Sequence, residues 1–279
     1  MADDVLYDLR EGGIAWITLN RPESLNAMGG NLMPMLADYL QKATWDRQVR
    51  CVVLTGAGRA FCAGGDVKGM AAGQDAIGPA APANGAPASA GSAMVWGVEG
   101  LRLSQRQTSY VLHTMPKPTI AMVNGHAVGA GFSLALACDV RIASDKAKVG
   151  TIFRNVGFSG DFGGSWFLQR LVGSGKAREM YFSGEILDAA QALEAGVVNR
   201  VVEHDRLEEE TMNFARHLAS GPSLAFARMK ENLNRGATSD LLTALDMEAL
   251  NMRLSGMTND HREAAKAFVE KRAPTFNGT

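Results

Sequence analysis

The sequence predicts an α/β fold with a largely parallel sheet, because short apolar runs typical of strands alternate with segments whose apolar side chains recur at helical spacing. The strand-like runs cover residues 5–20, 51–55 and 119–123. From about residue 205 the pattern is helical throughout. We therefore expect a core of residues 1–204 followed by a C-terminal helical region, residues 205–279.

The elements follow in order along the chain. Ile14 and Trp16 alternate with their neighbours after Glu11-Gly12-Gly13, which predicts that residues 5–20 form two strands joined by a tight turn. Residues 28–45 then predict a helix, and the strand at 119–123 leads into a second helix. In the C-terminal region, Ser220-Gly221-Pro222 separates helical stretches, and a further one runs from Leu241 to Leu254.

Composition excludes several classes of protein. A net charge of −1 over 279 residues gives no basic field for nucleic acid or an anionic membrane. The three cysteines are odd in number and form no CxxC pair, so we expect neither a disulfide framework nor a metal site. No apolar run approaches the ~18 residues of a membrane span, and the N-terminus has no signal-like apolar stretch. We expect a cytoplasmic protein.

One segment has the composition of a flexible insertion. Between residues 71 and 93, 19 of 23 residues are Ala, Gly, Pro or Ser, which cannot bury enough apolar surface to offset the entropy of ordering. A lid over a binding site and an inert surface insertion are both compatible with this composition.

Two glycine-rich segments are the strongest functional signal. Residues 61–68 and 124–131 each follow a strand-like run and offer mainly backbone to a ligand. Glycine permits close approach, and amides at the start of a helix are unpaired donors. Each segment alone could be an ordinary strand-to-helix turn. If the two meet, they form an oxyanion hole, which stabilises negative charge developing on a carbonyl oxygen.

These segments belong to an ordered set of motifs that spans nearly the whole chain. The set comprises Ile17-Thr18-Leu19-Asn20-Arg21-Pro22, Leu25-Asn26-Ala27, both glycine-rich segments, Gly163-Gly164 with Gln169-Arg170-Leu171, Ala195-Gly196-Val197-Val198, and Glu263-Ala264-Ala265-Lys266-Ala267-Phe268. In this order it resembles the enoyl-CoA hydratase/isomerase family, the crotonase superfamily. The resemblance implies a spiral of β-β-α units, a C-terminal helical region that packs across a trimer interface, and a homotrimer or a hexamer built as a dimer of trimers.

The resemblance also implies an acyl-CoA site and a place in fatty acid metabolism. The oxyanion donors would be the amides of Ala63 and Ala130, and coenzyme A would enter as part of the substrate, with no separate cofactor. The residues implied to bind the substrate and its coenzyme A are Leu25, Ala27, Ala60, Ala63, Gly64, Gly65, Asp66, Lys68, Ala130 and Lys271.

The acids of this site depart from the hydratase pattern. Family hydratases use two glutamates, and this chain has Ser133 and Phe153 at the corresponding positions. Asp161 falls where some family members carry a catalytic aspartate, although an aspartate before Gly163-Gly164 could also be a helix cap. Apolar neighbours should raise its pKa by desolvation and make it a better base. We expect an acyl pocket of Ser133, Phe153, Phe158 and Trp166.

The sequence therefore favours an isomerase that moves the double bond of a 3-enoyl-CoA to give a 2-enoyl-CoA, with Asp161 as its single base. Three alternatives stay open. One is a hydratase that recruits a non-standard acid such as Glu99. Another is a dehalogenase-like enzyme that uses Asp161 as a nucleophile on an aromatic acyl-CoA. The third is an acyl-CoA binder without catalysis.

Overall fold

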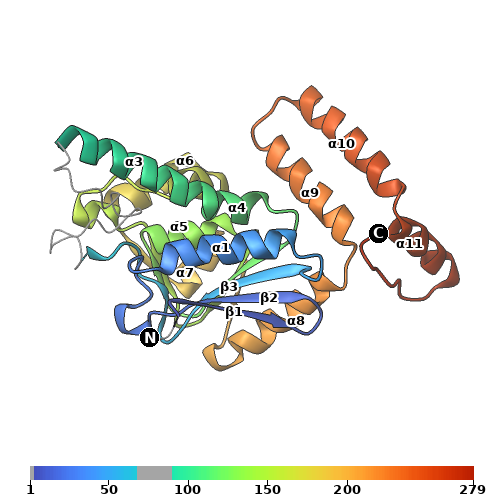
Figure 1. Cartoon of the computed structure of the whole chain (residues 1–279), viewed down its shortest axis with the longest axis horizontal. Helices are drawn as coiled ribbons and strands as arrows, with labels where there is room; N and C mark the ends of the chain where they lie inside the picture. The colour runs from blue at the N-terminus through green and yellow to red at the C-terminus, as the bar shows by residue number, and fades with distance from the viewer. Residues whose placement is uncertain (1–2, 68–89) are drawn as a thin grey trace.

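A computed structural model describes residues 3–67 and 90–279 of the chain (Figure 1). Most of the predicted insertion at 71–93 therefore lies outside the described residues. Its last residues, 90–93, begin helix α3 (Ala90–Gln107), so the predicted loop is shorter at that end.

The larger sheet has six strands in the order β1-β2-β3-β5-β7-β10. The hairpin predicted near the N-terminus is confirmed, since β1 and β2 pair antiparallel, and the other neighbours pair parallel. The strands are β1 (Val5–Arg10), β2 (Ile14–Leu19), β3 (Cys51–Gly56), β5 (Thr119–Val123), β7 (Val140–Ser144) and β10 (Arg200–Val202).

A second sheet of four strands, in the order β4-β6-β8-β9, runs alongside. Its strands β4, β6 and β8 each follow a strand of the larger sheet, so the chain repeats one strand in each sheet and then a helix. This is the predicted spiral of β-β-α units. The strands are β4 (Ala60–Cys62), β6 (His126–Val128), β8 (Lys148–Gly150) and β9 (Ile186–Asp188), and the helices of this part are α1 (Leu32–Trp45), α4 (Ser109–Thr114), α5 (Ala130–Ala137), α6 (Gly164–Ser183) and α7 (Ala189–Glu194).

Helix α1 begins four residues later than predicted. The Met28 amide donates to the Gly64 carbonyl at 2.7 Å, and Gly30 has a φ of +57° that does not belong to a helix. The segment before Leu32 is therefore a loop held against the first glycine-rich segment.

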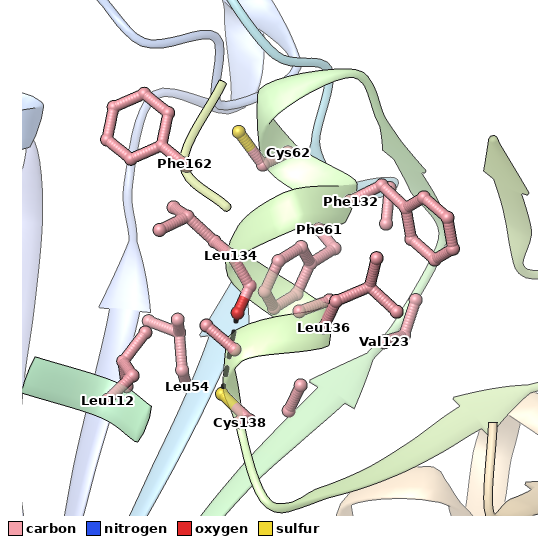
Figure 2. Packing of buried hydrophobic residues seen from close by; sticks show 14 of the residues in the cluster. Leu54, Phe61, Cys62, Leu112, Val123, Phe132, Leu134, Leu136, Cys138 and Phe162 are labelled. Atoms are coloured by element: carbon pink, nitrogen blue, oxygen red, sulfur yellow. Dashed lines mark hydrogen bonds between the residues drawn. The ribbon is translucent and has the colours of Figure 1, made fainter. Parts of the chain in front are cut away.

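Two apolar layers hold this part of the chain together. One face of the larger sheet packs on α8 (Leu207–Ala219), and the other packs on α1 and α5 (Figure 1). Every residue of α5 is buried, which is typical of a helix that is apolar all round. Figure 2 shows Cys62 and Phe162 beside one end of α5 and Cys138 at the other. The N-terminal end of α5 therefore lies inside the protein, next to the first glycine-rich segment.

Beyond α8, the C-terminal helices extend away from the two sheets (Figure 1). They are α9 (Ser223–Gly236), α10 (Leu241–Gly256) and α11 (Asn259–Glu270), as the helical pattern predicts. Helix α10 contacts α9 and α11 and leaves its large apolar side chains exposed. Within the described ranges, no helix is long and apolar enough to cross a membrane.

Candidate active site

The structure brings the two glycine-rich segments together, as the sequence predicts. β4 and β6 are parallel neighbours, and a Cβ added to Gly131 would lie 2.2 Å from the Cys62 carbonyl oxygen. A Cβ added to Gly64, whose φ is +88°, would lie 2.9 Å from the Val128 carbonyl oxygen and 3.3 Å from the Ala130 nitrogen. Only glycine allows this approach at both positions.

The second segment supplies its donor through the start of a helix. Gly129 is the N-cap of α5, with a φ of +55° and no side-chain cap, and Ala130 is the first helical residue. The first intrahelical bond runs from the Ser133 amide to the Gly129 carbonyl at 3.1 Å. Within residues 3–67 and 90–279, the Ala130 amide has no hydrogen-bond acceptor.

Several amides of the first segment are already used in hydrogen bonds within the protein. The Ala63 amide donates to the Leu25 carbonyl at 3.0 Å, so the prediction that Ala63 supplies a free donor is wrong. Burial raises the pKa of Cys62 to about 12, opposed by a hydrogen bond from the Gly64 amide to its sulfur. The Gly65 amide has no acceptor in the part of the chain that the structure describes. The segment thus leaves Gly65, two residues further on, as its free donor.

A buried asparagine fixes the loop that holds Ala63. Leu25 and Asn26 have φ values of +55° and +57°, which are strained for residues other than glycine. The Asn26 side chain accepts from the Arg21 amide at 2.8 Å and donates to the Ala60 carbonyl at 2.8 Å. Asn26 is fully buried, and sequence reasoning gave it no role. A polar residue inside the Leu25-Asn26-Ala27 motif was the available signal.

The other residues predicted to bind coenzyme A are spread over the chain. Ala27 and Ala60 are buried, and Leu25 is half-buried. Asp66 lies near Gly29, where an added Cβ would be 3.1 Å from a carboxylate oxygen. Lys68 is outside the described residues.

Lys271 lies far from these residues in a single copy of the chain. It follows the last helix, α11, with a φ of +54°, and α11 sits at the outer end of the C-terminal region (Figure 1). The structure therefore does not bring Lys271 to Gly64 and Gly65.

Asp161 sits in a strained turn at the start of α6. Gly160, Phe162 and Gly163 have φ values of +111°, +47° and +78°. Gly163 is the helix N-cap and no side chain caps the helix, which excludes the interpretation of Asp161 as the cap. Its Oδ1 atom is buried without a hydrogen-bond partner among the described residues. Burial raises the pKa of Asp161 to about 6, as the apolar neighbours predict.

Three side chains surround this turn. A Cβ added to Gly164 would lie 2.3 Å from Ser133 Oγ and 2.8 Å from the Tyr181 hydroxyl. Ser133 is buried, and its hydroxyl donates to the carbonyl one turn earlier in α5 at 3.3 Å. Phe153 stacks on Tyr181 with ring centroids 5.9 Å apart. Sequence reasoning missed Tyr181, because it lies in the last turn of α6, outside every recognised motif.

The remaining two predicted acyl-pocket residues lie elsewhere. Phe158 is half exposed at its loop. Trp166 packs edge-on against His113 and Phe167 and lines a cavity of about 800 Å³ between α4, α6 and α9. Asp161, Ser133 and Phe153 do not line that cavity. The structure therefore brings Ser133 and Phe153 to the Asp161 turn and places Trp166 on another surface of α6.

The described residues contain no group of three or more histidine, cysteine or acidic side chains that could hold a metal ion. The arrangement offers backbone donors and a carboxyl group. It can stabilise an anionic oxygen and move a proton.

Comparison with known proteins agrees with this arrangement. The model of the enoyl-CoA hydratase/isomerase family matches residues 10–83 and 99–279. The chain belongs to the enoyl-CoA hydratase/isomerase family. It is 37% identical over 270 residues to 1,2-epoxyphenylacetyl-CoA isomerase of Escherichia coli (strain K12), covering 96% of each chain. It is 34% identical over 264 residues to short-chain-enoyl-CoA hydratase of Clostridium acetobutylicum, covering 94% of each.

Solved structures show the same fold. An enoyl-CoA hydratase from Bacillus anthracis matches with a TM-score of 0.86 at 32% identity, covering 99% of this chain and 100% of that one. An enoyl-CoA hydratase from Mycobacterium smegmatis matches with a TM-score of 0.84 at 30% identity, covering 99% of each chain. The relatives include both isomerases and hydratases.

Proposed function

We propose that this protein is an acyl-CoA isomerase that converts a 3-enoyl-CoA into a 2-enoyl-CoA. The thioester carbonyl accepts hydrogen bonds from the amides of Gly65 and Ala130. Asp161 takes a proton from C2 and returns it to C4. Because loss of the C2 proton places charge on the thioester oxygen, the two amides stabilise the dienolate more than the substrate.

The observation that carries this proposal is the buried, unpartnered Oδ1 atom of Asp161, together with a pKa raised to about 6. A base with that pKa is ionised at neutral pH and still accepts a proton readily. No carboxylate stands at the two positions where the family's hydratases carry glutamates, since Ser133 and Phe153 occupy them. Glu99 is exposed and pairs with Arg102 on its own helix at 2.5 Å, which disfavours it as a second acid.

An aromatic acyl group is a second candidate substrate class. Phe153 and Tyr181 stack beside the turn, and Phe162 is fully buried within it. The similar enzyme of Escherichia coli is named for a phenylacetyl-CoA epoxide. Flat aromatic surfaces suit an aromatic ring as well as a linear enoyl chain.

Other features of the proposal extend beyond one chain. We infer that the protein is a cytoplasmic homotrimer, or a hexamer made of two trimers, which needs coenzyme A only as part of its substrate. The exposed apolar side chains of α10 support assembly, because such a surface is stabilised when a second copy covers it.

The test compares the wild type, Asp161→Asn and the matched control Glu99→Gln on 3-hexenoyl-CoA and 2-hexenoyl-CoA. Double-bond migration and water addition are followed separately by mass spectrometry and NMR. We expect migration by the wild type and Glu99→Gln, with a loss of roughly 10²–10⁴-fold in Asp161→Asn, the usual contribution of a general base.

Hydration that persists in Asp161→Asn and is lost in Glu99→Gln would establish the hydratase instead. A covalent adduct on Asp161 seen by mass would indicate the dehalogenase-like reaction. Tight binding of linear and aromatic acyl-CoA without turnover would indicate the non-catalytic binder.

A further inference from the structure

Two of the buried polar atoms that lack a partner lie around one turn. In the described parts of the chain, four buried side-chain atoms have no hydrogen-bond partner, namely Tyr7 Oη, Asp161 Oδ1, Tyr181 Oη and Thr211 Oγ1. Buried polar groups are normally paired, so each exception calls for an explanation. The proposed function explains Asp161 and leaves Tyr181 without a role.

The Tyr181 hydroxyl sits against the glycines on both sides of Asp161. A Cβ added to Gly160 would lie 3.3 Å from this hydroxyl, and a Cβ added to Gly164 would lie 2.8 Å from it. Larger residues at either position would displace the tyrosine. The backbone of the turn therefore packs closely against the Tyr181 hydroxyl.

The two groups also interact electrostatically. Burial raises the pKa of Tyr181, and the negative charge of Asp161 raises it further, so the phenol stays protonated and remains a donor. Burial raises the pKa of the Cys62 thiol to about 12, and the negative charge of Asp161 also raises it. The Cys62 thiol donates to the Asn26 carbonyl at 3.0 Å, and the Ser133 hydroxyl bonds within α5. Of the groups around Asp161, the Tyr181 phenol is the donor that is not already used.

We propose that Tyr181 is a positioning residue for Asp161, whose hydroxyl donates a hydrogen bond to Oδ1 of the ionised carboxylate and leaves Oδ2 to carry the proton between C2 and C4. The inference rests on the proposed role of Asp161 as the base. The two atoms border the same turn and both lack a partner, so each can satisfy the other. Fixing one oxygen orients the other, which favours transfer along a defined path.

A substitution of Tyr181 that removes only its hydroxyl distinguishes a structural role from a hydrogen bond to Asp161. Phenylalanine would fill the same space and keep the stack on Phe153 without burying an unpaired polar atom. If Tyr181 were only structural, Tyr181→Phe should therefore be neutral or stabilising. If the hydroxyl bonds to the charged carboxylate, removing it should raise the pKa of Asp161, because the charged form loses its donor.

The experiment is a carbon NMR titration of protein labelled at the aspartate carboxyl carbons, with the Asp161 signal assigned by its absence in Asp161→Asn. We expect Tyr181→Phe to raise the pKa of Asp161 by about one unit, the scale of one hydrogen-bond effect. Tyr7→Phe is the matched control, since it removes another buried, unpartnered hydroxyl, from β1, and should leave this titration unchanged.

Kinetics give a second readout. In Tyr181→Phe, the rise of kcat/KM with pH should move to higher pH by the same amount, with kcat reduced roughly tenfold and KM little changed. An unchanged Asp161 titration together with an unchanged pH profile would overturn the proposal. Because the NMR titration needs no turnover, it tests Tyr181 even if the isomerase assay fails.

Discussion

The turn that carries Asp161 and helix α10 differ in what they leave without a partner. The turn buries polar atoms that have no hydrogen-bond acceptor or donor among the described residues. Helix α10 does the opposite, because Asn251 is its buried residue while Leu241, Leu242 and Met252 are each about seven-tenths exposed. Both arrangements are costly in an isolated chain. The first is resolved by the hydrogen bond that we propose between Tyr181 and Asp161, and the second by a large apolar surface.

This contrast separates the two parts of the proposed function. The chemistry depends on a few atoms at the start of α5 and the start of α6, where backbone segments pack closely against one another. Assembly depends on many exposed side chains spread over a projecting helix. Substitutions in the first region should change rates, and those in the second should change the oligomeric state.

Among substitutions that change the backbone, Gly64→Ala should have the largest effect on the chemistry. The added methyl group would lie 2.9 Å from the Val128 carbonyl and push the segment that holds Gly65 away from Ala130. Loss of one oxyanion donor costs about 2.7–4 kcal/mol in the transition state, so we expect kcat to fall roughly 10²–10³-fold. Steady-state kinetics on the isomerase substrate measures this effect.

The control for backbone strain is Gly12→Ala. Gly12 has a similar φ of +82°, and an added Cβ there would meet no atom within 4 Å. Both variants carry the cost of a left-handed alanine, about 1–2 kcal/mol of stability. If Gly12→Ala loses as much activity as Gly64→Ala, the loss comes from strain and the oxyanion assignment is wrong.

The same two glycine-rich segments show how much of the candidate site could be predicted from the sequence. Their strand-like flanks and small residues predicted that they meet, and the structure confirms it. Which amide stays free could not be predicted, because the Ala63 amide is bonded to Leu25, a residue in a loop nearly forty positions away whose strained φ is not visible in the sequence. Tyr181 was missed for a related reason, since only the fold of α6 places it at the turn.

The periodic elements were easier to predict. The strands β3 and β5 could be predicted because each is a continuous apolar run, which the fold buries at every residue. The C-terminal helices could be predicted because their apolar side chains recur at a period near 3.6 residues. The start of α1 was misplaced because Met28 lies one helical turn before Leu32 and fits the apolar spacing, while its amide is bonded to the Gly64 carbonyl. The predictions from sequence failed where contacts between distant segments determine the backbone conformation.

The difference in stability between Asp161→Asn and the wild type should depend on pH. Burial raises the pKa of Asp161 from 3.8 to about 6, so the folded protein binds this proton more tightly than the unfolded chain. The contribution of Asp161 to the stability of the wild type is therefore greatest below about pH 4, and up to about 3 kcal/mol of it is lost as pH rises through about 6. Asparagine has no such titration. The free energy of unfolding of the variant relative to the wild type should increase by up to that amount between pH 4 and pH 8.

Urea denaturation at several pH values measures this difference, and a fixed cost of the buried amide cancels from the comparison. A difference that stays constant from pH 4 to pH 8 would show that Asp161 is not desolvated. In that case the carboxyl group would lack the property that suits it to be the base.

The smallest expected effect on chemistry comes from α10. Leu250, Leu254 and Met257 follow one another at helical spacing and are all exposed, so they form one apolar stripe. Leu250→Glu would place a charge in the interface that we infer, where covering one leucine contributes about 1.5–3 kcal/mol. We expect the mass measured by light scattering to fall from about three or six times 29.7 kDa toward that of one chain.

Trp45→Glu is the comparison variant, because Trp45 is also an exposed apolar residue, but lies on α1, outside the C-terminal helices. It should leave the mass unchanged.

Isolated Leu250→Glu chains should still have an Asp161 with a raised pKa, since the turn is built within one copy. If instead Leu250→Glu retains the mass of the wild type, the exposed stripe has no role in assembly. The proposed role of the turn in chemistry would then stand, and the proposed role of α10 in assembly would be wrong.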